Sequence, residues 1–547
     1  VPSYNQYSSG LAYFLKLNYP VWSLAEKRQM SGDWDRNQWV MSAIGSYYPG
    51  KKVARNPILA SKQSEFRGYM DTYFFDMERI MDAKGNYPFK DKISLHSHRG
   101  LRDNTKEEYT KPGGFQRQKL TGDILEKIFT GDVPAEFLSD RGTRWNLYKN
   151  ELFVVENNKL KKVKDYTPEA DKRYVGLKNL FSMEQAVDSA YGDGSTYITR
   201  KFEGARLTVE ETEKIIVEFL SSPLARDVSA LIQKRLNRKL YPFDVWYSGF
   251  QEQSYYSAAH LDSLTRSRYP FPQALEDDIK NILIRMGFPE SEAGFIGTHV
   301  DVHSVVSGGY SNQPQARGSK ALMTTMFGVE GLDYKGFRVA MHELGHVVCG
   351  IYSTSEVDNF LLAGVPTGGI TEGFAEVLAY KNIEGLGLFP YSGEEKDHLL
   401  ALATFWYLYE MGGNALTDIR TWKWMYENPD ASVSDLKNAV LDISAEIWNS
   451  YFSENFGGVR DSHILSVYNH FITGDLYLFN YFLGGIVSYQ LADAYGRGDL
   501  ATGLKEACRE GETLPEIWMQ KAVGTGFSLK PLFGGVRGAV DYYSTPR

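Results

Sequence analysis

The chain has 547 residues, 43% of them hydrophobic, with 60 basic and 68 acidic residues and a net charge of -8. This composition supports a large buried core, and the absence of long blocks of like charge argues against nucleic acid or an anionic membrane as the main partner. No apolar run is long enough to span a bilayer, so no transmembrane segment is expected, and two cysteines, Cys349 and Cys508, cannot supply a disulfide framework.

Residues 11–180 are rich in aromatic side chains and show helical periodicity in places, and further periodic segments follow. The predicted elements there are helices within 64–81 and over 275–286, one long or two shorter helices over 208–236, a loop over 109–114, and a hairpin or extended excursion over 147–163.

Residues 94–103 are unusual because they place two of the ten histidines, His96 and His98, beside Arg99 and Arg102. One interpretation is a solvated loop or a structural polar cluster. The other is a wall that contacts substrate.

The hydrophobic period then changes from helical to alternating. Residues 298–307 are β-branched at alternate positions and end at Gly308 and Gly309, and residues 321–327 repeat this character. The pattern predicts the strands of a small sheet just before the next helix.

A metal-binding pattern lies on that helix. His342 and His346 are four residues apart, so both project from one helical face and can hold one metal ion through their ring nitrogens. Glu343 points to the side of this pair, where its carboxylate can accept a proton from a metal-bound water. Gly345 leaves room for close approach by a neighbouring backbone or by substrate. Cys349, further along the helix, is interpreted as a small apolar residue.

A catalytic zinc needs a third protein ligand and an open fourth position. Glu372 is the best candidate, because it lies in an acidic, apolar, helix-like run over 370–380. Glu376 follows one helical turn later, where its carboxylate can accept the N–H of a ligand histidine and so fix its orientation. We therefore predict one zinc ion held by His342, His346 and Glu372.

The remainder of the chain is again helical, with predicted helices over 396–411, 435–452, 477–495 and 514–523. The predicted fold class is mainly α.

The motif at 342–346, followed after 25 residues by Glu372, resembles the gluzincin metallopeptidases. The gap is similar to that of the angiotensin-converting enzyme and thimet oligopeptidase families. In the converting-enzyme family an aspartate occupies the position of Glu376. The resemblance implies a two-lobed helical peptidase with a deep cleft and a small β-sheet beside the zinc helix.

In both families a histidine followed by tyrosines donates hydrogen bonds to the carbonyl under attack. His470, Tyr477 and Tyr481 occupy similar places, so the resemblance implies that they act as catalytic donors. One extra residue separates the two tyrosines, which leaves open which of them faces the zinc. Packing in the core is the alternative for both. Tyr468 stands where the converting enzyme has a lysine that binds the substrate carboxylate, which weakens an inference of carboxyl-end docking.

In gluzincins an edge strand before the zinc helix binds extended substrate through its main chain. By this resemblance His303 is the expected substrate contact. His299 is the competing choice, and a structural role is the alternative for His303.

The predicted function is zinc-dependent hydrolysis of short unstructured peptides, of the oligopeptidase or peptidyl-dipeptidase type. Residues 1–290 would form a helical wall and 291–547 the zinc-binding catalytic region, interleaved as one unit. The alternatives are a zinc aminopeptidase and a non-catalytic peptide- or glycan-binding protein that retains a metal site. Because the chain begins at Val1, we expect that a leader has been removed or left out of the sequence, and we expect export to the periplasm or the extracellular space.

Overall fold

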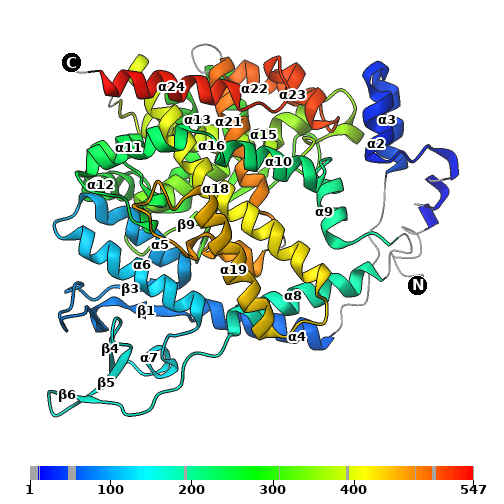
Figure 1. Ribbon diagram of the computed structural model, residues 1–547. Coiled ribbons are helices and arrows are strands. Elements are labelled where there is room, and N and C mark those ends of the chain that lie inside the picture. The colour runs from blue at the N-terminus through cyan, green and yellow to red at the C-terminus, as the bar shows by residue number, and fades with distance from the viewer. Residues whose placement is uncertain are drawn as a thin grey trace.

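The fold is mainly helical, as predicted, with small sheets at its periphery and beside the central helices (Figure 1). The computed structural model describes residues 10–46, 57–189, 194–306, 308–389, 393–474, 476–495 and 500–545, apart from Ala12 and Lys16. Among the described residues, no helix combines the length and apolar character needed to cross a membrane.

The helices up to residue 298 are α2 (Leu24–Met30), α3 (Arg36–Gly45), α4 (Pro57–Asp71), α5 (Ser97–Glu107), α6 (Gly114–Thr130), α7 (Ala135–Ser139), α8 (Lys172–Asp188), α9 (Tyr197–Gly204), α10 (Val209–Leu220), α11 (Leu224–Leu236), α12 (Ala258–Arg268), α13 (Pro272–Arg285) and α14 (Glu290–Thr298). The later helices are α15 (Tyr334–Ser355), α16 (Gly368–Tyr380), α17 (Asn382–Gly385), α18 (Glu394–Glu427), α19 (Val433–Tyr451), α20 (Asn469–Thr473), α21 (Leu478–Tyr495), α22 (Leu500–Cys508), α23 (Pro515–Val523) and α24 (Lys530–Ser544).

The strands are β1 (Phe74–Asp76), β2 (Ile80–Met81), β3 (Ser94–His96), β4 (Thr143–Asn146), β5 (Glu151–Glu156), β6 (Lys159–Lys162), β7 (Val300–Val305), β8 (Ser311–Asn312) and β9 (Ala321–Met326). They pair in the orders β1-β3, β2-β4-β5-β6 and β7-β9-β8. The hairpin predicted within 147–163 is therefore confirmed as β5 and β6, which pair antiparallel.

The structure sets the limits of two predicted helical segments, 64–81 and 208–236. The helix predicted within 64–81 ends at Asp71, and the chain continues as β1 and β2, because the aromatic run Tyr73-Phe74-Phe75 favours extended backbone and alternates in burial. The segment 208–236 forms two helices, α10 and α11, which Pro223 separates.

Two large hydrophobic cores hold the molecule together. The first joins residues from 66–250 with residues from 399–489 and 529–539, so the two halves of the chain interleave in it. The second joins residues from 261–386 with residues from 487–522 and surrounds the predicted metal helix. Helix α21 contributes to both, with Phe482 in the first core and Val487 in the second. It therefore lies at the junction between the cores.

The sheet beside the metal helix contains the two strands predicted for 298–307 and 321–327. Strand β9 lies in the middle, parallel to β7 and antiparallel to β8. Helix α15 packs against β9 and β8, whereas β7 packs against α13. The edge of the sheet nearest the metal helix is therefore β8.

Candidate active site

Helix α15 carries the first two predicted metal ligands. Asp333 caps its N-terminus by accepting a hydrogen bond from the Gly336 amide at 2.7 Å. Apolar residues cover most of its circumference, which buries the helix in the second core. His342 and His346 leave this core on one face, with side chains that are 24% and 13% exposed.

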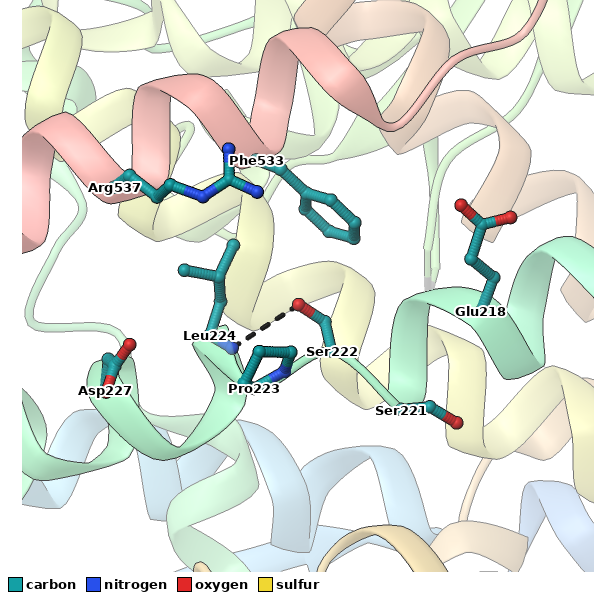
Figure 2. A pocket seen from close by; sticks show the side chains of 8 residues that line it. All are labelled: Glu218, Ser221, Ser222, Pro223, Leu224, Asp227, Phe533 and Arg537. Carbon is teal, nitrogen blue, oxygen red and sulfur yellow. Dashed lines mark hydrogen bonds between the residues drawn. The ribbon is translucent and has the colours of Figure 1, made fainter.

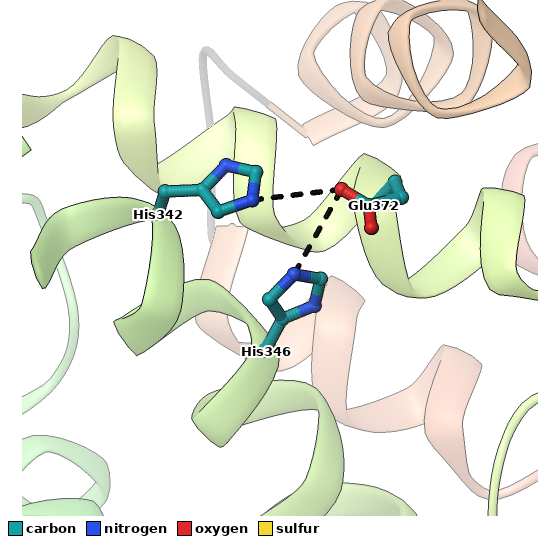
Figure 3. A group of neighbouring side chains, drawn as sticks. All are labelled: His342, His346 and Glu372. Atoms are coloured by element: carbon teal, nitrogen blue, oxygen red, sulfur yellow. Dashed lines mark ion pairs between the residues drawn. The ribbon is translucent and has the colours of Figure 1, made fainter. Parts of the chain in front are cut away.

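Helix α16 brings Glu372 to the two histidines (Figure 3). Its Oε2 atom lies 3.5 Å from Nε2 of His342 and 3.8 Å from Nε2 of His346. In a tetrahedral zinc site with bonds of this kind, neighbouring ligand atoms are roughly 3.3–3.5 Å apart. The two distances to Glu372 are therefore close to the spacing that one bound ion requires, and all three ligand atoms lie within 4.8 Å of one another.

Glycine allows the backbones of the two ligand helices, α15 and α16, to come into direct contact. A Cβ atom added to Gly345 would lie 2.5 Å from the Cα atom of Ala375 on α16. The same device recurs between α16 and α21, where a Cβ on Gly373 would lie 2.4 Å from Val487 and one on Gly484 would lie 2.5 Å from the Cβ of Glu372. The expectation that Gly345 admits a neighbouring backbone is confirmed. Helices α15, α16 and α21 thus form one tightly packed layer.

The chemistry of the donor set fits a divalent metal ion. Glu372 is only 3% exposed, and its Oε2 atom is buried without a hydrogen-bond partner among the described residues. A buried carboxylate oxygen left unpaired is costly unless another group satisfies it. Since this oxygen faces two imidazole nitrogens, a metal ion bound by all three residues would supply the missing partner.

Each ligand is held from behind by a further side chain. Nδ1 of His342 lies 3.3 Å from Glu376, as predicted for that glutamate, and Nδ1 of His346 lies 2.8 Å from the Thr371 hydroxyl. The Tyr477 hydroxyl donates to Oε1 of Glu372 at 2.6 Å. These contacts leave the inward-facing nitrogens and Oε2 available for a metal ion. Sequence reasoning missed Thr371, although its position directly before Glu372 could have suggested it.

The charges of these residues are strongly coupled. Burial lowers the pKa of His342, but the carboxylates of Glu376, Glu372 and Glu343 outweigh it and raise the pKa to about 9. Burial and the neighbouring His342 lower the pKa of His346 to about 3. Burial also raises the pKa of Glu372 to about 7. The carboxylates of the site thus favour a positive charge at this point, either a proton on His342 or a bound metal ion.

Glu343 lies beside the ligands without joining them. It is 7% exposed, and burial raises the pKa of its carboxyl, an effect that His342, Ser311 and Arg99 oppose. A Cβ added to Gly309 would lie 3.2 Å from the Cγ of Glu343, so the chain before β8 runs directly past this carboxylate. A raised pKa in a site sheltered from water suits a group that accepts and returns a proton.

His470, Tyr477 and Tyr481 cluster next to the ligands. The ring of Tyr481 lies 5.3 Å from that of Tyr477 and 5.7 Å from that of His470, centroid to centroid. Tyr477 is engaged with Glu372, whereas the Tyr481 hydroxyl makes no hydrogen bond within the described part of the chain. The structure therefore separates the two tyrosines, with Tyr477 holding a ligand and Tyr481 keeping its hydroxyl available.

His303 does not lie on the strand that borders the metal helix. It is exposed on β7, at the far edge of the sheet, where it pairs with Thr324. On the near side, Gln313 donates to the His346 carbonyl at 3.3 Å, immediately after β8. This arrangement does not support the expectation for His303, because β9 lies between its strand, β7, and the strand that borders α15, β8. The competing His299 lies further back, at the end of α14.

The segment 94–103 contains a structural contact and also side chains that lie near the candidate site. His98 is buried and contacts Arg173 at 3.0 Å, so it belongs to a structural polar cluster. Arg99, in contrast, lies beside the loop that passes Glu343, with its Nη1 3.2 Å from where a Cβ of Gly308 would be. The guanidinium of Arg102 stacks 4.3 Å above the Tyr468 ring. Helix α5 therefore lies beside the loop that passes Glu343, and its role as a wall that contacts substrate stays a prediction.

A separate hollow of about 440 Å³ lies between the turn joining α10 to α11 and the last helix, α24 (Figure 2). Its lining is Glu218, Ser221, Ser222, Pro223, Leu224, Asp227, Phe533 and Arg537. None of the candidate site residues contributes to it, and its charges are of mixed sign. The chemistry described above does not extend to this hollow.

Comparison with known proteins identifies the fold. No protein-family model matches the chain, and no curated protein sequence matches it. A solved structure of PZ peptidase A with an inhibitor matches 98% of this chain and 84% of its own, at 14% identity and a TM-score of 0.57. A Chlamydophila abortus protein assigned as a peptidase (98% and 81% covered, 14% identity, TM-score 0.54) and one assigned as oligoendopeptidase F (98% and 82%, 13%, 0.52) are also similar. At this identity the likeness shows a shared fold.

Proposed function

We propose that this protein is a zinc metallopeptidase that cleaves short unstructured peptides. The observation that carries the proposal is the convergence of His342, His346 and Glu372 on one point, with Glu343 beside it. The fold supports it, since it is shared over most of the chain with proteins described as peptidases. We further propose that it resembles the angiotensin-converting enzyme and thimet oligopeptidase families in its catalytic residues.

His342, His346 and Glu372 would hold the zinc ion, which when bound supplies a Lewis acid that polarises a peptide carbonyl and makes water acidic. Glu343 accepts the proton of the attacking water and returns it to the leaving amine, a task for which its raised pKa is suited. The Tyr481 hydroxyl donates a hydrogen bond to the oxyanion that develops from the carbonyl, and His470 lies beside it.

An extended peptide fits the surroundings of the ligands better than a folded protein. The loop through Gly309 into β8 offers main-chain groups beside Glu343, and Arg99 of α5 lies next to the same loop. Pairing of a peptide with such an edge fixes its backbone while its side chains alternate. We therefore assign substrate binding to β8 in place of β7. The mode of cleavage that we propose is that of an oligopeptidase or a peptidyl-dipeptidase.

The test is to incubate the purified protein, with zinc measured by elemental analysis, with a mixed peptide library and to identify the products by mass spectrometry. Internal or dipeptide-releasing cuts support the proposal, whereas release of single amino-terminal residues would indicate an aminopeptidase. Glu343→Gln is the matched control, since the amide preserves shape and removes the base. Binding of peptides without cleavage by the zinc-loaded wild-type protein would overturn the proposal in favour of a binding protein.

A further inference from the structure

The only two cysteines of the chain contact each other in the fold. Cys349 lies on the metal helix α15, three residues after the ligand His346, and Cys508 is the last residue of α22. The Sγ atom of Cys508 lies 3.9 Å from the carbonyl oxygen of Cys349, although 159 positions separate them in sequence. Both residues are buried, at 2% and 0% exposure. Two residues placed independently in a chain of this length would rarely meet in this way.

Ion pairs at the edge of the contact between α15 and α22 help to hold the two helices in the position that brings the cysteines together. Glu356, one residue past the end of α15, pairs with Lys505 at 3.3 Å and with Arg509 at 3.4 Å. Positions 505 and 508 lie on one face of α22, as do 349, 352 and 356 on α15. The ion pairs and the cysteine contact therefore belong to one interface.

The thiols are protected once the protein is folded. Burial and the neighbouring Cys349 thiol raise the pKa of the Cys508 thiol, so the reactive thiolate is scarce in the folded state. An oxidant would reach the pair most readily while the chain folds, when α22 has not yet closed on α15. A bond formed at that stage would be shielded from reductants afterwards.

We propose that Cys349 and Cys508 are a disulfide-forming pair that ties the metal helix to α22 when the chain folds in the presence of a disulfide oxidant. One thiol loses its proton and attacks the oxidant's sulfur, which gives a mixed disulfide. The second thiolate then displaces the oxidant's remaining sulfur. The two protein thiols are oxidised to one disulfide, and the oxidant is reduced to two thiols, so two electrons are transferred.

The proposal is tested by refolding the denatured, fully reduced protein in mixtures of reduced and oxidised glutathione. The product is then denatured and treated with an alkylating agent, and its intact mass is measured. The expected result is a monomer that has lost two hydrogen atoms and takes up no alkyl group. Wild-type protein refolded in reduced glutathione alone, with both thiols alkylated, is the reference.

Two further measurements connect the bond to the observed geometry. Cys349→Ser and Cys508→Ser should each keep one alkylatable thiol or one bound glutathione and form no internal bond. The oxidised wild type should unfold about 4 °C above the reduced form, since the bond closes a long loop. The thermal midpoint of the Cys349→Ala/Cys508→Ala variant should not depend on the redox buffer. Two alkylated thiols at every glutathione ratio, or bonds only between molecules, would overturn the proposal.

Discussion

Replacing Tyr477 with phenylalanine would remove a single oxygen atom from the side chain that holds Glu372. The lost hydrogen bond is 2.6 Å long and is made to a carboxyl that is 3% exposed, so water cannot readily replace it. A hydrogen bond to a charged group contributes about 1.5–3 kcal/mol. At about 1.4 kcal/mol for each factor of ten, zinc affinity should fall roughly ten- to a hundredfold. Competition with a chromophoric chelator measures this change directly.

Tyr481→Phe is the matched control, because it removes the same atom from a ring only 5.3 Å away. Its hydroxyl makes no hydrogen bond among the described residues, so zinc affinity should be unchanged. As the proposed oxyanion donor it should instead lose roughly a hundred- to a thousandfold in kcat of the zinc-saturated enzyme. If Tyr477→Phe kept full zinc affinity, or if both variants lost affinity equally, the division of labour between the two tyrosines would be refuted.

Four further outcomes are expected. Glu376→Ala should weaken zinc binding roughly ten- to a hundredfold in the same chelator assay, because His342 loses its orienting partner, and an unchanged affinity would remove Glu376 from the site. Gly345→Ala should lower the free energy of unfolding by about 1–3 kcal/mol in denaturant titrations, since its Cβ meets backbone, while Gly534→Ala, with open space around it, should not destabilise the protein. Zinc affinity should rise from pH 7 to pH 9, because the pKa of His342 is raised to about 9 and zinc must displace that proton; calorimetry in buffers of different ionisation enthalpy should detect at least about one proton released at pH 7, since Glu372 is also partly protonated there, and none released would contradict this. An unstructured peptide should be cleaved far faster than a stable folded domain carrying the same sequence in an ordered surface loop, and equal rates would indicate an open site.

The local pattern of the metal ligands could be read from sequence because helical geometry determines it. His342 and His346 share a face by their spacing alone, and Glu376 follows Glu372 by one turn. The meeting of the two helices is a tertiary event, yet Gly345 hinted at it, since only glycine permits the observed approach to Ala375. These predictions depended on the geometry of single helices and on the close contact between α15 and α16 at Gly345.

Other features depended on tertiary packing that periodicity does not encode. The helix predicted to end at Met411 continues to Glu427, because Gly412 and Gly413 do not end it. They make room instead, since a Cβ on Gly413 would lie 2.7 Å from the Phe452 ring. Helix α24 was not predicted at all, as its glycines dilute the helical pattern.

The roles of the residues around the metal site were the hardest to predict. Tyr477 and Tyr481 differ by one helical turn, and only the rotation of α21 against α16 decides which hydroxyl reaches Glu372. His303 lies on a six-residue strand with a β-branched alternation, whereas Ser311 lies on a two-residue strand that no such pattern marks, and the strand order β7-β9-β8 decides which of them borders α15. Sequence spacing contains neither the rotation nor the strand order.

The glycine contacts among α15, α16 and α21 also limit how the molecule can move. At these glycines the helices touch through backbone atoms, as between Gly345 and Ala375, or through the first atoms of a side chain, as between Gly373 and Val487, so sliding one helix past another would bring closely packed atoms into collision. We therefore expect α15, α16 and α21 to move together as one rigid body, which carries the three ligands and Tyr481 with it. Any motion that admits a peptide would then take place around these three helices, for example where α5 contacts α15 through the 2.8 Å ion pair between Asp103 and Lys335.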